Sequence, residues 1–431
     1  MTGECGGLRP QLADHGVVPT LTYIGEVLGN VTGGFRRTAV YDGLVTLSLD
    51  VNLQKLVGWP GAKVRVQGYN PHGAGLTQKA LGDLGAVSNI DAYDTVRLYT
   101  LWLEQSFLDD RFSLRAGVLA VDDEFYASGP ASLFVQSDFG WPASIALNFP
   151  LPIFAIAGPG VRLRVQPMRG VYAQFGAYDG NPAPAALPDP LPDATPSNDF
   201  NKHGTRWALR RDSGAFLAGE VGMHFCDPPA PGTVPDADGK KAAKEPRGLC
   251  GSYKAGFAYH TDTFSDPYDA ALIRLGSSLA PAQARARDGD WAIYALADQE
   301  LFREPGTETQ GLSAFVHASY VPVDRNAYDF SGEAGLVYTG LLPGRDADAC
   351  GLGFAIIHAS AANAAAVRDA NRADGTHFAT PDYEIAIEAT YNARLTPWLS
   401  LQPDVQLILH PGGTSEHGNA LVIGLRSTFT F

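Results

Sequence analysis

The chain has 431 residues, of which 48 are glycine and 18% are charged, and its net charge at pH 7 is -14. The acidic balance argues against nucleic acid as a partner. Because no apolar run reaches 18 residues, the sequence contains no candidate for a transmembrane helix. The abundance of glycine and aromatic residues favours β structure with many turns.

From residue 17 onward, segments with an apolar residue at every second position alternate with turn-forming residues. This rhythm predicts about 16 strands over residues 17–431, and residues 1–16 are predicted to form a separate periplasmic segment. The strands are predicted to begin, in chain order, near Val17, Asp42, Gly61, Asp94, Arg111, Ala157, Gly170, Gly214, Gly251, Gly289, Gln310, Tyr328, Gly351, Asp382, Trp398 and Asn419.

The connections between the predicted strands alternate between two sizes. Those at one end are mostly short, and those at the other end include long ones, at residues 73–93, 121–156, 181–211, 265–288 and 360–381. Short turns on one side and long loops on the other are typical of outer-membrane barrels. We therefore predict an all-β fold, a single closed antiparallel transmembrane barrel with short periplasmic turns and long extracellular loops.

The last strand shows the alternation clearly. Phe431, Phe429 and Leu425 share one face, and Arg426 lies on the other. A soluble β-sheet buries its apolar face, whereas a porin turns that face to lipid and keeps a polar lumen. The number and length of the strands favour the porin. A final strand that ends on an aromatic residue also resembles the signal read by the barrel-assembly machinery, so Phe431 is predicted to contact that machinery.

The four cysteines form no CxxC pair, so we expect no metal site, and no cofactor is expected either. The strand assignment places all four at the short-turn end, where oxidation is allowed. Proximity then predicts two disulfides, Cys226–Cys250 and Cys5–Cys350, with free buried thiols as the alternative.

Several long stretches resemble the carbohydrate-selective porin family of the OprB type. They are residues 23–43, 101–117, 122–142, 158–167 and 395–413, and they include LWLEQSFLDDRFSLRAG and GPGVRLRVQP. The resemblance covers nearly the whole chain and implies a barrel of this strand count through which glucose-like sugars diffuse. It departs at Cys5, where the family has tryptophan, and this departure supports a bridge at that position.

The longest loop, residues 121–156, is predicted to fold into the lumen because it is rich in apolar residues. Passage of a sugar requires donors and acceptors that replace water on its hydroxyl groups, and an aromatic ring on which its apolar face can lie. The loop carries both kinds of group, namely Asp122, Asp123, Glu124, Asp138 and Trp141.

Strand alternation turns a row of arginines toward this loop. Their apolar neighbours point outward, so the inward residues are predicted to be Arg65, Arg115, Arg162 and Arg164, and the family pattern adds Glu104. Guanidinium groups present a rigid fan of donors suited to sugar hydroxyls. Each arginine could instead brace the wall, Asp122 and Asp123 could shape turns, and Trp141 could pack within the loop.

The predicted function is passive, carbohydrate-selective diffusion through the outer membrane of a Gram-negative bacterium, after removal of a signal peptide. The alternatives are a general or ion-selective porin, or an outer-membrane lipid hydrolase, for which the spacing of His410, Ser415, His417 and Asn419 gives little support. The expected partners are small sugars in the lumen, and outer-membrane lipids and lipopolysaccharide around the barrel. The chain is expected to act either as a monomer or as a homotrimer.

Overall fold

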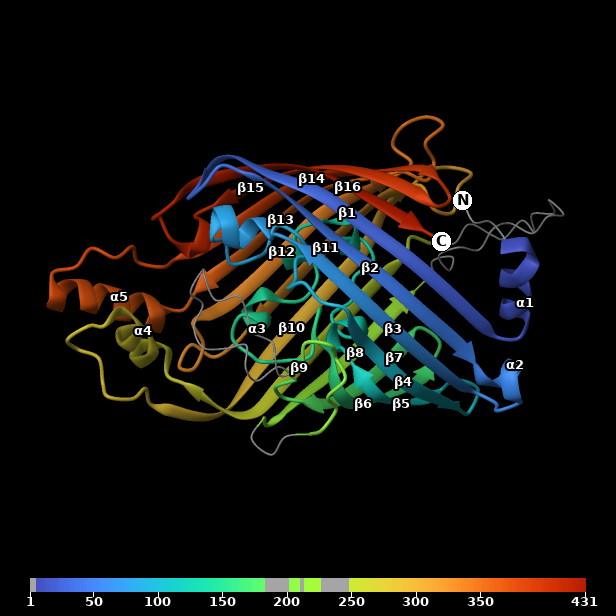
Figure 1. The fold of residues 1–431 in the computed structure, drawn as a ribbon, viewed down its shortest axis with the longest axis horizontal. Helices are drawn as coiled ribbons and strands as arrows, with labels where there is room; N and C mark the ends of the chain where they lie inside the picture. The colour runs from blue at the N-terminus through green and yellow to red at the C-terminus, as the bar shows by residue number, and fades with distance from the viewer. Residues whose placement is uncertain (1–4, 183–200, 210–212, 226–247) are drawn as a thin grey trace.

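The computed structural model describes residues 5–182, 201–209, 213–225 and 248–431. Sixteen antiparallel strands close into one barrel, each paired with its sequence neighbours (Figure 1). The first eight are β1 (Val17–Gly34), β2 (Ala39–Asn52), β3 (Ala62–Gly73), β4 (Arg97–Phe107), β5 (Phe112–Leu119), β6 (Gly158–Met168), β7 (Val171–Asp179) and β8 (Ala215–Phe225). The others are β9 (Gly251–Ser265), β10 (Ala286–Arg303), β11 (Gly311–Tyr320), β12 (Tyr328–Thr339), β13 (Ala349–Ala359), β14 (Tyr383–Thr396), β15 (Leu399–Leu409) and β16 (Gly418–Thr430). The predicted fold class is confirmed.

The first and last strands close the barrel. Tyr23 of β1 pairs with Phe429 of β16, and Val27 pairs with Leu425. The backbone N–H of Phe431 donates to the carbonyl oxygen of Leu21 at 2.8 Å, which extends this seam to the end of the chain. Every strand therefore has a hydrogen-bonded neighbour on both sides, and no edge of the sheet is exposed.

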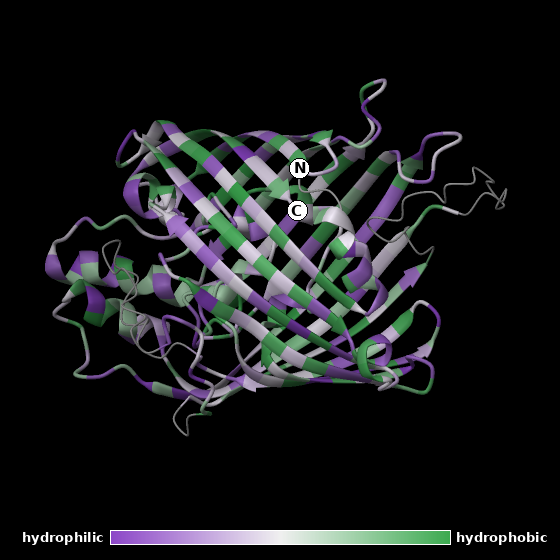
Figure 2. Cartoon of the chain, turned by 45° about the vertical axis from the view of Figure 1, so that its right-hand side comes forward, coloured by the Kyte–Doolittle hydropathy of each residue, from purple (hydrophilic) through white to green (hydrophobic). Residues whose placement is uncertain are grey.

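Apolar and polar side chains alternate between the two faces of the wall, as bands of contrasting hydropathy along the strands show (Figure 2). On β16, Ile423 and Leu425 are exposed on the outer face, whereas Ala420 and Val422 are buried on the inner face. A lipid-facing exterior accounts for this exposure of apolar residues. No helix among the described residues is long and apolar enough to cross a bilayer.

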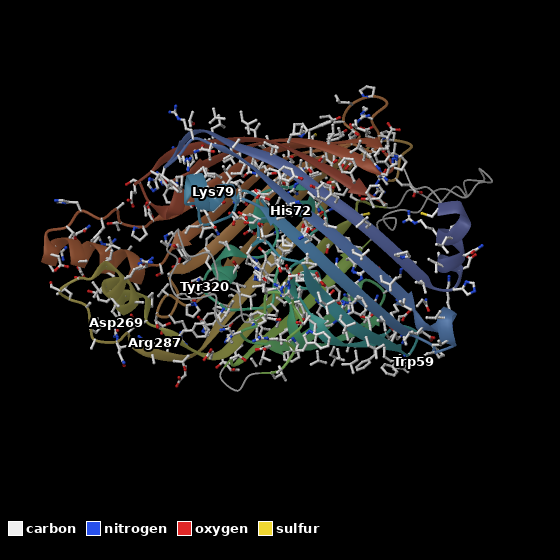
Figure 3. The ribbon with its side chains drawn as sticks, in the orientation of Figure 1. Trp59, His72, Lys79, Asp269, Arg287 and Tyr320 are labelled. Carbon is white, nitrogen blue, oxygen red and sulfur yellow. The ribbon has the colours of Figure 1, made fainter. Side chains whose placement is uncertain are left out.

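The two ends of the barrel differ. One, here called the short-turn end, carries α1 (Leu8–Asp14), α2 (Leu53–Val57) and tight turns such as residues 108–111. The other, the long-loop end, carries α4 (Pro267–Leu275) and α5 (Ala361–Asp374), which pack against each other. In Figure 3, Trp59 marks the first end, and Asp269 and Arg287 lie near the second.

Cysteine pairing differs from the prediction. Cys5 and Cys350 both carry free thiols, so the predicted Cys5–Cys350 bridge is not formed. A shared end of the barrel was the basis of that prediction, but β13, which holds Cys350, is four strand spacings from β1. Neighbouring strands are about 5 Å apart, so residues at the same end of the barrel can lie well beyond the roughly 7 Å between Cα atoms that a disulfide allows. Cys250 is disulfide-bonded. Cys226 lies outside the described residues, so the Cys226–Cys250 pairing stays a prediction.

Two long loops fold back into the barrel, where apolar side chains hold them. Residues of the 74–96 loop, including Leu76 and Leu81, share a buried cluster with Leu28 of β1 and Ile408 of β15. The 120–157 loop, here called the third loop, contains the short helix α3 (Ala143–Ala146) and forms a second cluster with wall residues. The structure thus places the third loop in the lumen, where it narrows the space left for solutes.

Candidate functional site

A cavity of about 980 Å³ lies between the third loop and the inner wall. Its lining comes from strands between β3 and β11 and is rich in charged groups of both signs. The described lining residues include Arg65, Arg115, Asp123, Glu124, Arg164, Tyr172, Lys254, Asp298, Glu300 and Arg303.

The register of three neighbouring strands builds the centre of one wall. Glu104 of β4 pairs with Arg115 of β5, and Arg115 pairs with Arg162 of β6, so all three side chains point to the same face. Two arginines directly opposite each other repel. The repulsion is offset by Glu104 on one side and by Glu124, which reaches the pair from the third loop.

Arg162 is the buried member of this group, with 2% of its side chain exposed. Its Nη2 lies 2.5 Å from Glu104 Oε2 and 2.6 Å from Glu124 Oε1, and its Nη1 donates to the Ser113 hydroxyl at 2.7 Å. Nε donates to the other oxygen of Glu124 at 2.9 Å. All the nitrogens of this guanidinium are therefore bonded to protein, so Arg162 ties the third loop to the wall.

Arg115 faces the cavity. Its Nη2 lies 2.9 Å from Glu104 and its Nη1 lies 3.2 Å from Glu124. Its guanidinium lies over the ring of Trp102, with 3.8 Å between the guanidinium carbon and the ring centroid. Arg65 lies farther over the same ring, at 5.7 Å, and its Nε donates to Asp50 at 2.6 Å. The ion pairs and the ring fix Arg115 in one orientation.

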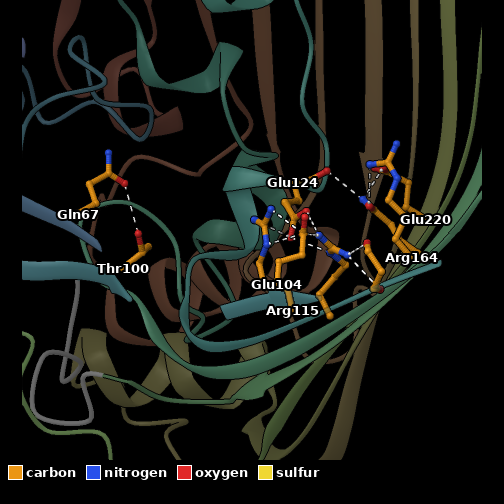
Figure 4. A network of polar contacts seen from close by, with 10 residues as sticks. Gln67, Thr100, Glu104, Arg115, Glu124, Arg164 and Glu220 are labelled. Atoms are coloured by element: carbon orange, nitrogen blue, oxygen red, sulfur yellow. Dashed lines mark hydrogen bonds and ion pairs between the residues drawn. The ribbon is translucent and has the colours of Figure 1, made fainter. Parts of the chain in front are cut away.

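Arg164, two residues beyond Arg162 on β6, continues the row toward β7. Its guanidinium carbon lies 4.0 Å from the ring centroid of Tyr172, and Nη1 is 3.5 Å from the amide oxygen of Gln174. The Tyr172 hydroxyl and the Gln174 amide both donate to Glu220, at 2.7 and 3.1 Å. Figure 4 shows Arg164 and Glu220 beside the Glu104, Arg115 and Glu124 cluster.

The four acids predicted on the third loop each occupy a different environment. Glu124 joins the arginines, and Asp123 is exposed on the cavity wall. Asp122 accepts a hydrogen bond from the backbone of Phe154 at 2.9 Å, which closes the loop on itself. Asp138 is buried and accepts from the side-chain amide of Gln136 at 2.9 Å. Asp138 does not belong to the described cavity lining.

Trp141 also lies outside the described cavity lining. It is 7% exposed, belongs to the buried cluster that includes Phe125 and Ile145, and meets Tyr126 edge-on with 6.1 Å between the ring centroids. The predicted placement of Trp141 opposite the arginine row is therefore corrected. Alternation has no meaning in an irregular loop, so the sequence could not show which of its aromatic residues face inward. Trp102 and Tyr172 are the rings beside the arginines.

Wall carboxylates on two sides of the lumen hold the third loop through its backbone. Glu388 of β14 accepts hydrogen bonds from the N–H groups of Val135 and Gln136, at 2.7 and 2.9 Å. Glu220 of β8 accepts from the N–H of Tyr126 at 2.9 Å. Buried carboxylates that accept several N–H bonds hold a loop firmly. The side of the cavity formed by the loop is thus as well defined as the wall.

Several lining residues escaped the sequence analysis, notably Lys254 of β9, Tyr172, Asp298 and Glu300. The alternation in β9 contained the signal, because the exposed Tyr253 and Phe257 leave Lys254 on the inner face. Among the described residues, no group of three or more histidine, cysteine, aspartate or glutamate side chains is arranged to hold a metal ion.

Comparison with known proteins agrees with this fold. The model of the carbohydrate-selective porin, OprB family, matches residues 36–431. Porin B of Pseudomonas aeruginosa is 27% identical over 451 aligned positions, which cover 100% of this chain and 91% of that protein. The putative porin QuiX of Acinetobacter baylyi is 22% identical, with 100% and 93% covered. The high-pH structure of Pseudomonas putida OprB superposes with a TM-score of 0.85 at 24% identity, and covers 100% of this chain and 98% of that one.

The matched region contains every strand from β2 to β16 and the whole charged cavity, so the similarity extends to the pore itself. The family and its relatives are channels, not enzymes, which excludes the lipid hydrolase. The chain therefore belongs to the carbohydrate-selective porin family, OprB type, and it is a passive outer-membrane channel for sugars.

Proposed function

We propose that the group around Arg115 is the selective constriction of this porin and that it admits neutral, glucose-like sugars. The observation that carries the proposal is the fixed position of Arg115, held by Glu104, Glu124 and the Trp102 ring at the cavity surface. Donors whose position is fixed in advance replace the water on a sugar hydroxyl without a further cost of ordering.

The predicted site residues take different roles in this proposal. Arg65, Arg115, Asp123, Glu124 and Arg164 line the cavity and offer donors and acceptors to the solute. Glu104 and the buried Arg162 position them. The contacts must stay weak and numerous, because a tightly bound sugar would not leave the channel.

Arg115→Ala tests the proposal in planar bilayers. Glucose is added stepwise, and the block of the ion current gives its half-blocking concentration. We expect about a tenfold higher value in Arg115→Ala, because a charge-assisted hydrogen bond contributes roughly 1.5 kcal/mol. Arg111→Ala, in the turn at the short-turn end, is the matched control and keeps the wild-type value. Unchanged block in Arg115→Ala would leave a general or ion-selective diffusion pore as the better description.

The remaining expected partners also belong to this proposal. The exposed apolar residues of the outer wall suit outer-membrane lipids and lipopolysaccharide, and the β1–β16 seam that ends at Phe431 suits recognition by the barrel-assembly machinery.

The N-terminal segment, residues 1–16, is assigned to the periplasm because the carbonyl oxygen of Gly16 accepts a hydrogen bond from the backbone N–H of Asn52, next to α2 at the short-turn end. Light scattering of the purified protein distinguishes a monomer from a homotrimer.

A further inference from the structure

Two cations of the cavity differ from the others in their contacts. Arg65 pairs with Asp50, and Arg115 pairs with Glu104 and Glu124. In contrast, Arg164 contacts the neutral Gln174 amide and the Tyr172 ring, and the ammonium of Lys254 donates to the backbone carbonyl of Ala127. No ion pair within 4 Å joins either cation to a carboxylate among the described residues.

The neighbouring carboxylates already have other donors. Glu220 is buried and accepts from Tyr172, Gln174, Tyr294 and the backbone of Tyr126. Asp298 accepts from the Ser128 hydroxyl at 2.8 Å and lies 3.2 Å from His317. Two lining acids accept no hydrogen bond of this kind from the part of the chain that the structure describes. Asp123 has Arg115 and Arg65 as its cationic neighbours, and Glu308 lies in the β10–β11 turn. The full charges of Arg164 and Lys254 therefore remain available to a solute.

The two cations lie on the same inner face of the wall, Arg164 on β6 and Lys254 on β9. Tyr172 of β7 pairs with Gly222 of β8, and Gly222 pairs with Lys254 of β9. The Tyr172 ring occupies the space above Gly222, where an added Cβ would lie 2.3 Å from a ring carbon. Lys254 thus stands two strand spacings, about 10 Å, from the backbone of Tyr172, on the same face. Arg164, which lies over the same ring, completes a row of cation, aromatic ring and cation.

We infer that Arg164 and Lys254 form a carboxylate-binding subsite of the pore, which accepts sugar acids such as aldonic acids. This inference rests on the proposed function, since the hydroxyl groups of the acid use the same contacts as a neutral sugar. The planar guanidinium matches the two oxygens of a carboxylate, and the flexible ammonium adds a second positive charge. The carbonyl of Ala127, which accepts a hydrogen bond from Lys254, is a neutral acceptor that a carboxylate displaces.

The experiment compares gluconate with glucose as blockers of the ion current in planar bilayers. For the wild-type protein we expect a half-blocking concentration about tenfold lower for gluconate, which corresponds to one charge-assisted contact. Arg164→Gln and Lys254→Gln should each bring the ratio of the two concentrations close to one. Lys79→Gln removes an exposed lysine near the long-loop end (Figure 3), outside the described cavity lining, and should keep the wild-type ratio.

A second variant changes the geometry and keeps both charges. Gly222→Ala pushes the Tyr172 ring away from the wall and separates the cations, so it should also reduce the preference for gluconate. Equal block by the two solutes in the wild-type protein overturns the inference, and so does an equal loss of preference in Lys79→Gln, which would show a general field effect. Failure of the proposed function can be distinguished from failure of this inference, because glucose itself would then produce no block of the ion current. The ion current of each variant shows that its barrel has folded.

Discussion

The guanidinium of Arg115 lies over the indole of Trp102 at 3.8 Å, and both residues belong to neighbouring strands in the narrow part of the lumen. The face of the ring contacts the guanidinium, and Glu104 and Glu124 form ion pairs with its nitrogens. Orientation and charge of this one group therefore depend on side chains from β4, β5 and the third loop.

Removal of the ring should weaken sugar block without removing any charge. We expect Trp102→Leu to raise the half-blocking concentration of glucose about fivefold, because a cation–aromatic contact contributes roughly 1 kcal/mol. Trp102→Phe should retain part of the effect, and Trp59→Leu, an exposed tryptophan at the short-turn end, should have none. Equal block in Trp102→Leu and wild type would show that the ring does not position Arg115.

Loss of the buried arginine should affect stability more than selectivity. Arg162→Met removes the buried one of the two arginines that Glu104 and Glu124 share, and removal of one member of a buried ionic group costs about 3–5 kcal/mol. We expect a lower free energy of unfolding, measured by urea denaturation of the detergent-solubilised barrel. Arg368→Met, at an exposed position on α5, is the control. A variant as stable as the wild type would contradict the bracing role of Arg162.

Release of the third loop should widen the pore. Glu388→Ala removes the carboxylate that accepts hydrogen bonds from the N–H groups of Val135 and Gln136, so the loop can move toward the mouth of the lumen. Single-channel recording should show a higher or more variable conductance and weaker block by glucose. Glu416→Ala, in the exposed turn before β16, should behave as the wild type. A steady wild-type conductance in Glu388→Ala would mean that apolar packing alone holds the loop.

The number of free thiols tests the cysteine assignments. The denatured, unreduced protein should react with two equivalents of a thiol reagent, at Cys5 and Cys350. Cys250→Ser should raise the count to three, because it frees the partner of Cys250, which we predict to be Cys226. A wild-type count of zero would restore the Cys5–Cys350 bridge, and a count of four would exclude both disulfides.

The strands could be predicted from the sequence because each barrel strand alternates between lipid and lumen, and this alternation leaves a pattern of period two. The same pattern placed Arg65, Arg115, Arg162 and Arg164 on the inner face. It also predicts that Lys254 faces inward, although Lys254 was not among the predicted site residues. A pattern along one strand has no information about distances around the circumference, which is why the bridge from Cys5 to Cys350 was wrong.

The third loop resisted prediction for a different reason. Its path depends on contacts with distant strands, such as the pairing of Glu124 with Arg162 and the packing of Trp141 in a buried cluster. Charge and aromatic content identified the loop as part of the pore, yet they could not separate Glu124, which joins the arginines, from Asp138, which bonds to Gln136 within the loop.

Besides the apolar packing, wall carboxylates fasten the inward loops through their main chain. Glu384 accepts from the N–H groups of Leu84 and Gly85, as Glu388 does from Val135 and Gln136. Any residue other than proline supplies such an N–H, so the side chains of these loop positions can change while the attachment persists. The wall of the barrel can therefore hold loops of different sequence. New solute preferences can arise by mutation of a loop while the residues of the wall stay the same.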